Sequence, residues 1–207
     1  MTTSNIAGVL LAAGEASRFR KAAGAQGPET KLVAQHEGKA LVRHVAEAAL
    51  AAGLSPLIVV TGHAQEAVRD ALRGLDFAHV HNPAYASGMA SSLKAGLAAL
   101  PADAPGALVL LGDMPLVSAG LIARLTQAFA AHPSAAAVLP VHEGARGNPA
   151  LIARALFAPI MQLTGDAGAR QVLQRLGDRI IEVDVDDPAA RLDIDTPDAL
   201  AALQPRR

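Results

Sequence analysis

The chain of 207 residues contains no cysteine and no tryptophan, and it has a single tyrosine. Without cysteine there are no disulfide bonds, thiolate metal sites, iron–sulfur clusters or cysteine nucleophiles. Aromatic residues make up only 2% of the sequence, so a core built from its 51% hydrophobic residues must be aliphatic and rich in alanine. The net charge is -1, and neither clustered cations nor stacking rings are present to bind a polynucleotide. We therefore expect no nucleic-acid partner.

Long hydrophobic runs are also absent. No apolar stretch reaches the ~18 residues that a membrane-spanning helix requires, because Arg43 and Glu47 interrupt the most apolar segment. Residues 6–14 have the length of a signal-peptide core, but the nearest cations follow this run instead of preceding it, the reverse of a secretory signal. We expect a soluble cytoplasmic protein with no membrane partner, folded as one domain over residues 1–207.

Short apolar runs alternate with segments of helical periodicity along most of the chain. Predicted strands cover residues 6–12, 56–61, 77–81, 106–111, 136–140, 148–152 and 180–185. Predicted helices cover residues 40–52, 64–73, 91–100, 118–131 with Ser118 as N-cap, 168–176 and 196–203. This order predicts a single-domain, Rossmann-like three-layer α/β/α fold with a mostly parallel sheet, which binds ligands at the carboxyl ends of its strands.

The first predicted strand ends in the turn Leu11-Ala12-Ala13-Gly14, and Arg18 follows four residues after the glycine. Such a turn exposes backbone N–H groups, and a helix N-terminus after it favours an anion, so the turn is a candidate phosphate site. An ordinary strand-to-helix turn with a surface arginine explains the same residues. The turn is neither G-x-G-x-x-G nor a P-loop. Lys31 belongs to this site only if the aperiodic segment 21–30 folds back over the turn.

Two acidic segments are candidates for metal binding. Asp113 follows the strand 106–111, where a carboxylate suits Mg²⁺, although a turn aspartate bonding to its own backbone is an equal alternative. In the sequence DIDTP at 193–197, either Asp195 or Thr196 is expected to cap a helix with proline in its first turn. Asp193 has no such local role, which makes it the better candidate for a second ligand.

The seven histidines show no metal-ligand spacing. His63 follows the strand 56–61 and is the one histidine expected to lie near the ligand edge of the sheet. No Ser-His-Asp arrangement can be inferred, and the nucleophile motif G-x-S-x-G is absent.

Six segments, in order, resemble nucleotidyltransferases of the molybdopterin-nucleotide-forming type. They are LAAG-x-x-SRF at 11–19 followed by Lys31, NP at 82–83 with GMASSL at 88–93, GDMP at 112–115, RGNP at 146–149, GD-x-GAR at 165–170 and DIDTP at 193–197. The resemblance runs over residues 6–203, and the RGNP and GD-x-GAR segments point to the molybdenum cofactor cytidylyltransferases. Two departures concern the shape of the phosphate lid: Arg20 stands where the family has glycine, and the loop before Lys31 is long.

The resemblance implies roles for individual residues. Arg18 and Lys31 would hold the β- and γ-phosphates and, with Asp113, carry catalysis. Further nucleotide contacts would come from Leu11, Ala12, Ala13, Gly14, Thr61, Gly88 and Ser92, with Ser92 and the Gly88 backbone reading cytosine. Asp113 would bind Mg²⁺ together with Asp193 or Asp195. The acceptor would face Gly147, Asn148, Pro149, Asp166 and Arg170.

The implied reaction transfers CMP from CTP to molybdopterin and releases pyrophosphate, with Mg²⁺ as cofactor and a molybdoenzyme or chaperone as a protein partner. The residues leave alternatives open. The same chemistry could use GTP, or an acceptor such as a sugar phosphate, methylerythritol phosphate or a deazaflavin precursor, although GDMP argues against the methylerythritol enzymes. A non-catalytic nucleotide-binding module is a further alternative, against which the presence of Arg18, Lys31 and Asp113 argues. A plain scaffold with accidental motifs is the last.

Overall fold

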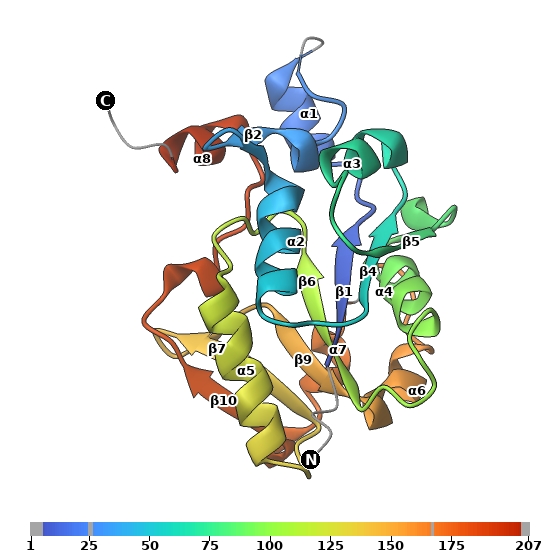
Figure 1. Ribbon diagram of the computed structural model, residues 1–207, viewed down its shortest axis with the longest axis vertical. Helices are drawn as coiled ribbons and strands as arrows, with labels where there is room; N and C mark the ends of the chain where they lie inside the picture. The colour runs from blue at the N-terminus through green and yellow to red at the C-terminus, as the bar shows by residue number, and fades with distance from the viewer. Residues whose placement is uncertain (1–5, 25–26, 167, 204–207) are drawn as a thin grey trace.

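The computed structural model describes residues 6–24, 27–166 and 168–203, and within these ranges eight strands form one sheet (Figure 1). Along the sheet the order is β10-β7-β9-β6-β1-β4-β5, with β8 paired to β7. The strands are β1 (Ala7–Ala12), β4 (Leu57–Thr61), β5 (Ala78–His81), β6 (Gly106–Leu111), β7 (Ala137–His142), β8 (Ala145–Arg146), β9 (Ala150–Ala153) and β10 (Ile180–Asp184). A separate hairpin joins β2 (Gln35–His36) to β3 (Lys39–Ala40).

Most of the sheet is parallel, as the sequence predicts. β1 pairs in parallel with β4 and β6, β4 with β5, and β7 with β10. The exception is β9, which runs antiparallel between β6 and β7. The short segment before β9 therefore lies at the same edge as the carboxyl ends of β1, β4, β6 and β7, and this edge gathers the loops that carry the motifs.

Helices cover both faces of the sheet because its central strands are apolar on both sides (Figure 1). Leu10 of β1 lies in register with Val59 and Leu110, and these side chains pack under α2 (Leu41–Ala51), α3 (Gln65–Ala71) and α5 (Ala119–Ala131). Val9 points to the other face, under α4 (Met89–Ala98), α6 (Phe157–Ile160) and α7 (Arg170–Leu173). The expected three-layer α/β/α fold is confirmed.

A third, smaller cluster lies beyond the ligand edge of the sheet. Phe19 of α1 (Ser17–Ala23), Leu41 and the buried Ile194 pack together beneath α8 (Pro197–Ala202). The single-turn 3₁₀ helices are η1 (Lys31–Val33), η2 (Tyr85–Ser87), η3 (Arg154–Leu156), η4 (Gly177–Arg179) and η5 (Pro188–Ala190). This cluster anchors the segments that bring Lys31 and the late aspartates to the sheet.

Several bounds are shifted by one or two residues, and short elements such as the β2–β3 hairpin, β8 and α6 were not predicted. Three local expectations differ further from the structure. The segment 21–30 is not wholly irregular, because α1 continues to Ala23. The helix expected over 168–176 is reduced to Arg170–Leu173, followed by a 3₁₀ turn. The strand expected at 148–152 begins at Ala150, because residues 147–149 form the turn that enters β9. In the part of the chain that the structure describes, no helix combines the length and apolar composition needed to cross a bilayer.

We predict that Ser118→Ala lowers the free energy of unfolding by about 1 kcal/mol. The Ser118 hydroxyl accepts a hydrogen bond from the Leu121 N–H at 3.1 Å and so satisfies an orphan donor in the first turn of α5. Urea unfolding measures the effect. Ser118→Asp is the matched control, since aspartate also caps, and equal losses in both variants would contradict the capping role.

Candidate active site

The turn after β1 is held between the ends of two neighbouring strands. The Gly112 N–H donates to the Leu11 carbonyl at 3.0 Å, and the His63 N–H donates to the Ala13 carbonyl at 3.1 Å. These bonds extend the sheet by one residue beyond the strands. They place the β1 turn, the GDMP turn and His63 side by side at the ligand edge.

Three carboxylates converge at this edge. Asp113, Asp193 and Asp195 each offer an oxygen, and these atoms all lie within 4.8 Å of one another. The convergence has a backbone cause, since the Ile194 N–H donates to the Asp113 carbonyl at 2.9 Å. Ile194 itself is 1% exposed, so its burial turns both flanking aspartates outward toward Asp113.

Thr196, and not Asp195, caps the last helix. The Thr196 hydroxyl accepts from the Ala199 N–H at 3.1 Å. From the sequence, either residue could be the cap. Asp193 was predicted to be the better second metal ligand because it had no capping role. Because threonine takes the capping role, Asp195 is also free to join the carboxylate cluster.

Two cations pair with two of the three carboxylates. The Lys31 ammonium lies 2.7 Å from Oδ2 of Asp113 and 2.7 Å from Oδ1 of Asp195, and its side chain is only 12% exposed. Arg18 contacts the other oxygen of Asp195 at 3.1 Å from a side chain that is 82% exposed. The segment before Lys31 therefore does return to the β1 turn, which was the condition for assigning this lysine to the site.

The pKa values of these groups follow from the arrangement. Burial opposes the charge on Lys31, but the attraction of Asp113 and the hydrogen bonds to both aspartates overcome it and hold the Lys31 pKa above its ordinary value. The hydrogen bond from Lys31, aided by Arg18, lowers the pKa of Asp195. Both pKa shifts favour the charged forms of Lys31 and Asp195 at neutral pH.

The donor set fits a small divalent cation. Carboxylate oxygens are the protein ligands that Mg²⁺ and Mn²⁺ prefer, and each of the three aspartates can supply one. The Lys31 ammonium already lies against two of them, which shows that positive charge is favourable at this point. These residues could therefore hold the metal that the sequence predicts.

A cavity of about 370 Å³ adjoins the carboxylates. Ala13, Gly14, Lys31 and Asp113 line one part of it, and Gly88 and Ser92 also contribute to its wall. Ser92 is 5% exposed, and its hydroxyl accepts a hydrogen bond from Asn82 at 3.0 Å. Most of the residues predicted to bind nucleotide are thus brought together around a single cavity.

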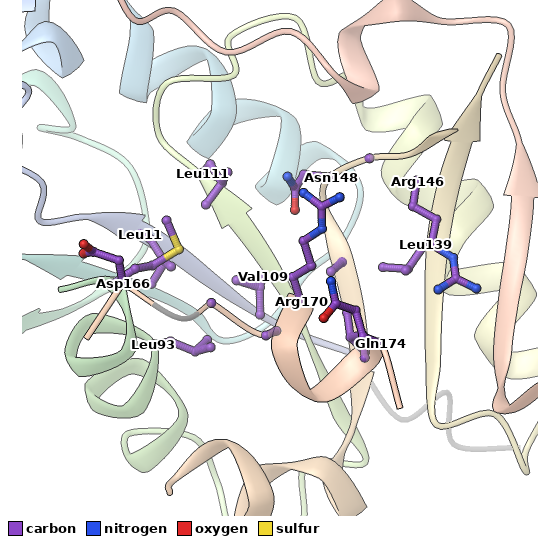
Figure 2. A pocket seen from close by; sticks show the side chains of 16 residues that line it. Leu11, Leu93, Val109, Leu111, Leu139, Arg146, Asn148, Asp166, Arg170 and Gln174 are labelled. Atoms are coloured by element: carbon purple, nitrogen blue, oxygen red, sulfur yellow. The ribbon is translucent and has the colours of Figure 1, made fainter. Parts of the chain in front are cut away.

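A second cavity of about 400 Å³ shares Leu11, Met89, Leu111 and Asp166 with the first (Figure 2). Its wall is mainly aliphatic, and its polar groups come from the predicted acceptor segments. Arg170 extends toward Asn148, whereas Arg146 points away from them and pairs with Glu182 of β10 at 2.6 Å (Figure 2). Asp166 lies at the opposite end of this cavity, beside the first one (Figure 2).

The RGNP turn is fastened to the segment that carries the late aspartates. The Asn148 N–H donates to the Ala190 carbonyl at 2.7 Å. A Cβ on Gly147 would lie 2.2 Å from that same carbonyl oxygen, so only glycine permits this close approach. Gly147 therefore serves the position of the turn, while Asn148 presents its side chain to the cavity (Figure 2).

Six of the predicted residues line neither cavity. Arg18, Asp193 and Asp195 belong to the charged cluster beside the first cavity, and the other three are Ala12, Thr61 and Pro149. Ala12 and Thr61 are 1% and 0% exposed, and the Thr61 hydroxyl bonds to His79 at 2.6 Å. Pro149 is buried as well. For these three buried residues, direct contact with substrate remains a prediction.

Three further residues line the cavities although they were not among the predicted contacts. Tyr85 and Met89 lie within the matched segment around GMASSL and line the first cavity. Arg191 lies two residues before Asp193, the first residue of DIDTP. It lines a cleft with Arg170 and Asp193. Closeness to a motif could have nominated all three. Arg20, the departure from the family glycine, lies 3.2 Å from the His63 ring nitrogen.

Comparison with known proteins agrees with this geometry. Residues 8–180 match the family described as the MobA-like NTP transferase domain. The chain is 28% identical over 145 residues to a molybdenum cofactor cytidylyltransferase from Escherichia coli K12, covering 70% of this chain and 71% of that protein. It is 30% identical over 196 residues to a nicotine blue oxidoreductase from Paenarthrobacter nicotinovorans, covering 92% of each.

Longer relatives share only this part of their sequence. The bifunctional protein GlmU from Kineococcus radiotolerans is 38% identical over 134 residues, which cover 63% of this chain but only 26% of that protein.

Solved structures show the same fold over nearly the whole length. A nucleotidyl transferase from Methanothermobacter thermautotroptrophicus superimposes with a TM-score of 0.82 at 25% identity, covering 96% and 95% of the two chains. A complex of Rv0371c from Mycobacterium tuberculosis H37Rv with manganese gives a TM-score of 0.76 at 26% identity, covering 96% and 97%.

We predict that Lys31→Met raises the affinity for Mn²⁺ alone by about tenfold, because the ammonium competes with a cation for two of the carboxylates. Calorimetric titration in the absence of nucleotide measures it. Lys39→Met removes a surface ion pair with Glu47 and serves as the matched control, with no expected change. Unchanged or weaker Mn²⁺ binding in Lys31→Met would show that the lysine and the cation do not share this site.

Proposed function

The chain belongs to the MobA-like NTP transferase family, and from this premise we propose that it transfers CMP from CTP to molybdopterin with release of pyrophosphate. The observation that carries the proposal is the convergence of Asp113, Asp193 and Asp195 with Lys31 beside one cavity at the ligand edge of the sheet. The similarity to a cytidylyltransferase supports the choice of CTP and of a pterin acceptor.

The nucleotide would lie in the first cavity with its triphosphate toward the charged end. Lys31 would exchange a carboxylate partner for phosphate oxygens, and the exposed Arg18 would move with it onto the β- and γ-phosphates. The backbone at Ala13 and Gly14 would face the phosphates from the β1 turn. Mg²⁺, bound by the three aspartates, would supply positive charge to the phosphate oxygens.

No protein nucleophile is needed for this reaction. An oxygen of the acceptor phosphate forms a bond to the α-phosphorus, the bond from that phosphorus to the bridging oxygen of the β-phosphate breaks, and pyrophosphate leaves. The monoester is already largely ionised near pH 7, so no strong base has to remove a proton. The residues act by holding three anionic groups in line, which is the main source of rate in phosphoryl chemistry.

The acceptor would occupy the second cavity. Its aliphatic wall suits an uncharged ring system, and Arg170 and Arg191 line the cleft that leads from it to Asp193. Two guanidinium groups on that path suit an acceptor phosphate on its way to the α-phosphorus. The two cavities share Leu11 and Leu111 in their walls, which supports a reaction between substrates that would lie next to each other.

Similarity along nearly the whole chain to a nicotine blue oxidoreductase favours a second candidate, electron transfer to an organic substrate. Use of GTP, another phosphorylated acceptor and a non-catalytic binding role are the remaining alternatives. A pyrophosphate-release assay with each of the four ribonucleoside triphosphates, with and without molybdopterin, separates them. The proposal requires release that depends on both CTP and molybdopterin, whereas an oxidoreductase or a binding module releases none.

We predict that Asp113→Asn lowers the rate of CTP-dependent pyrophosphate release by about 10²–10³-fold while the melting temperature stays within a few degrees. Asp113 is the aspartate held by the sheet itself, so its loss removes the fixed member of the cluster. Asp70→Asn, on an exposed surface pair with Arg73, is the control. Retained turnover in Asp113→Asn would refute the assignment.

We further predict that Arg191→Met raises the KM for the acceptor about tenfold and leaves the KM for CTP unchanged, because one charge-assisted contact to the acceptor phosphate is lost. Steady-state kinetics with each substrate varied in turn give both constants. Arg175→Met removes an exposed arginine outside the described cavities and should change neither. An equal rise in both constants would place Arg191 on the nucleotide instead.

A further inference from the structure

We propose that Tyr85 contacts the base of the bound nucleotide and sets the affinity of the first cavity for it. This inference rests on the proposed use of a nucleoside triphosphate, but not on the identity of the acceptor. Tyr85 is the one tyrosine of the chain, and it is the only aromatic residue among the described residues that line this cavity.

The cavity has a charged end at Lys31 and Asp113, where a triphosphate and its counter-ions belong. The carboxylates of Glu15 and Asp166 also line its wall. Tyr85, Ala86, Gly88 and Ser92 contribute a part of the wall that carries no charge. A nucleotide whose phosphates occupy the charged end therefore directs its base toward the side formed by η2 and the start of α4.

Tyr85 packs directly against the backbone of Gly62, the residue that follows β4. A Cβ added to Gly62 would lie 2.5–2.8 Å from the Cβ, Cγ and Cδ1 atoms of Tyr85. No side chain can occupy that position while the tyrosine stays where it is. The ring of His63 lies on the same side, with its centroid 6.1 Å from that of Tyr85. The tyrosine is thus seated against the end of β4 by close packing.

The same tyrosine is tied to the residue expected to read the base. The Tyr85 N–H donates to the Asn82 carbonyl at 3.3 Å, and the buried Asn82 amide donates to the hydroxyls of Ser91 and Ser92 at 2.8 and 3.0 Å. Asn82 therefore ties the backbone of Tyr85 to the Ser92 hydroxyl. A rigid aromatic ring beside a hydrogen-bonding group is the arrangement that binds a flat heterocycle, through stacking and an edge contact.

A role in filling the hydrophobic core does not explain the position of Tyr85 in the cavity wall. Its side chain remains partly exposed in the cavity wall, whereas Phe19, which is 3% exposed, serves the hydrophobic interior. A residue needed only to fill space beside Gly62 would not have to face the cavity. A partly open ring beside a site for a heterocycle can gain contact area when that heterocycle binds.

The composition provides a direct test. Because the chain has no tryptophan and one tyrosine, its ultraviolet-excited emission reports on Tyr85 alone. The intact protein, with Mg²⁺ present, is titrated separately with CTP, UTP, ATP, GTP and inorganic pyrophosphate. Free N-acetyltyrosinamide corrects for light absorbed by the bases, and calorimetry of the same mixtures measures binding independently. We expect quenching by the nucleotide that binds and none by pyrophosphate.

Variants then separate a base contact from a structural role. Tyr85→Phe keeps the ring and should bind the nucleotide within about twofold of the unaltered chain, whereas Tyr85→Leu should weaken it about tenfold or more. Gly62→Ala, which displaces the ring, should act in the same direction. Binding of pyrophosphate should be unchanged in all three, and this readout replaces turnover as the test of intact phosphate contacts.

Each outcome decides the matter. Nucleotide binding without quenching, equal CTP affinity in Tyr85→Leu, or equal losses for CTP and pyrophosphate would each overturn the role of Tyr85 while leaving the transferase proposal standing. Quenching by another triphosphate in place of CTP would support the Tyr85 contact and overturn the choice of base. If no nucleoside triphosphate binds, both the inference and the proposed function are rejected.

Discussion

The site depends on compensation of charge. Three carboxylates within 4.8 Å of one another repel, and they can be held there only if cations are fixed among them. The fold supplies Lys31 from a 3₁₀ turn and Arg18 from α1, which offset two of the three negative charges before any ligand arrives. A triphosphate with a divalent cation carries both signs of charge. The cationic side chains can therefore exchange carboxylates for phosphate oxygens while the carboxylates gain the metal ion, and no charged group loses its partner.

Backbone hydrogen bonds hold this balance in place. The segment between η5 and α8 lies outside the regular strands and helices, yet its Ile194 N–H bonds to the Asp113 carbonyl, and the carbonyl of Ala190, at the end of η5, accepts from Asn148. The turn at 147–149, the late aspartates and the end of β6 are thereby joined in one chain of contacts. Because backbone hydrogen bonds fasten these loops to the strand ends, side chains from distant parts of the sequence are brought close together.

Much of this arrangement was predictable from local patterns, and the remainder was not for physical reasons. The strand Gly106–Leu111 and the Ser118 cap are encoded by neighbouring residues, and the structure has both. The reversed direction of β9 depends on pairing partners far along the chain, which periodicity does not report. The contact of Lys31 with Asp113 joins a loop to a strand end, and the roles inferred for Tyr85 and Arg191 depend on cavities that form only when distant segments meet. Thr61 has the right position in sequence, but its hydroxyl is already engaged by His79.

The reversed strand divides the molecule in a way that bears on its evolution. The first cavity is lined almost entirely by residues before 114, whereas β7, β9, α7 and the turn at 147–149 supply much of the second cavity. Mutations between residues 137 and 176 can therefore reshape the second cavity while Lys31, Asp113 and the DIDTP segment at 193–197 stay unchanged. A lineage with this architecture can alter that cavity by drift in one central stretch of the gene without rebuilding the charged cluster.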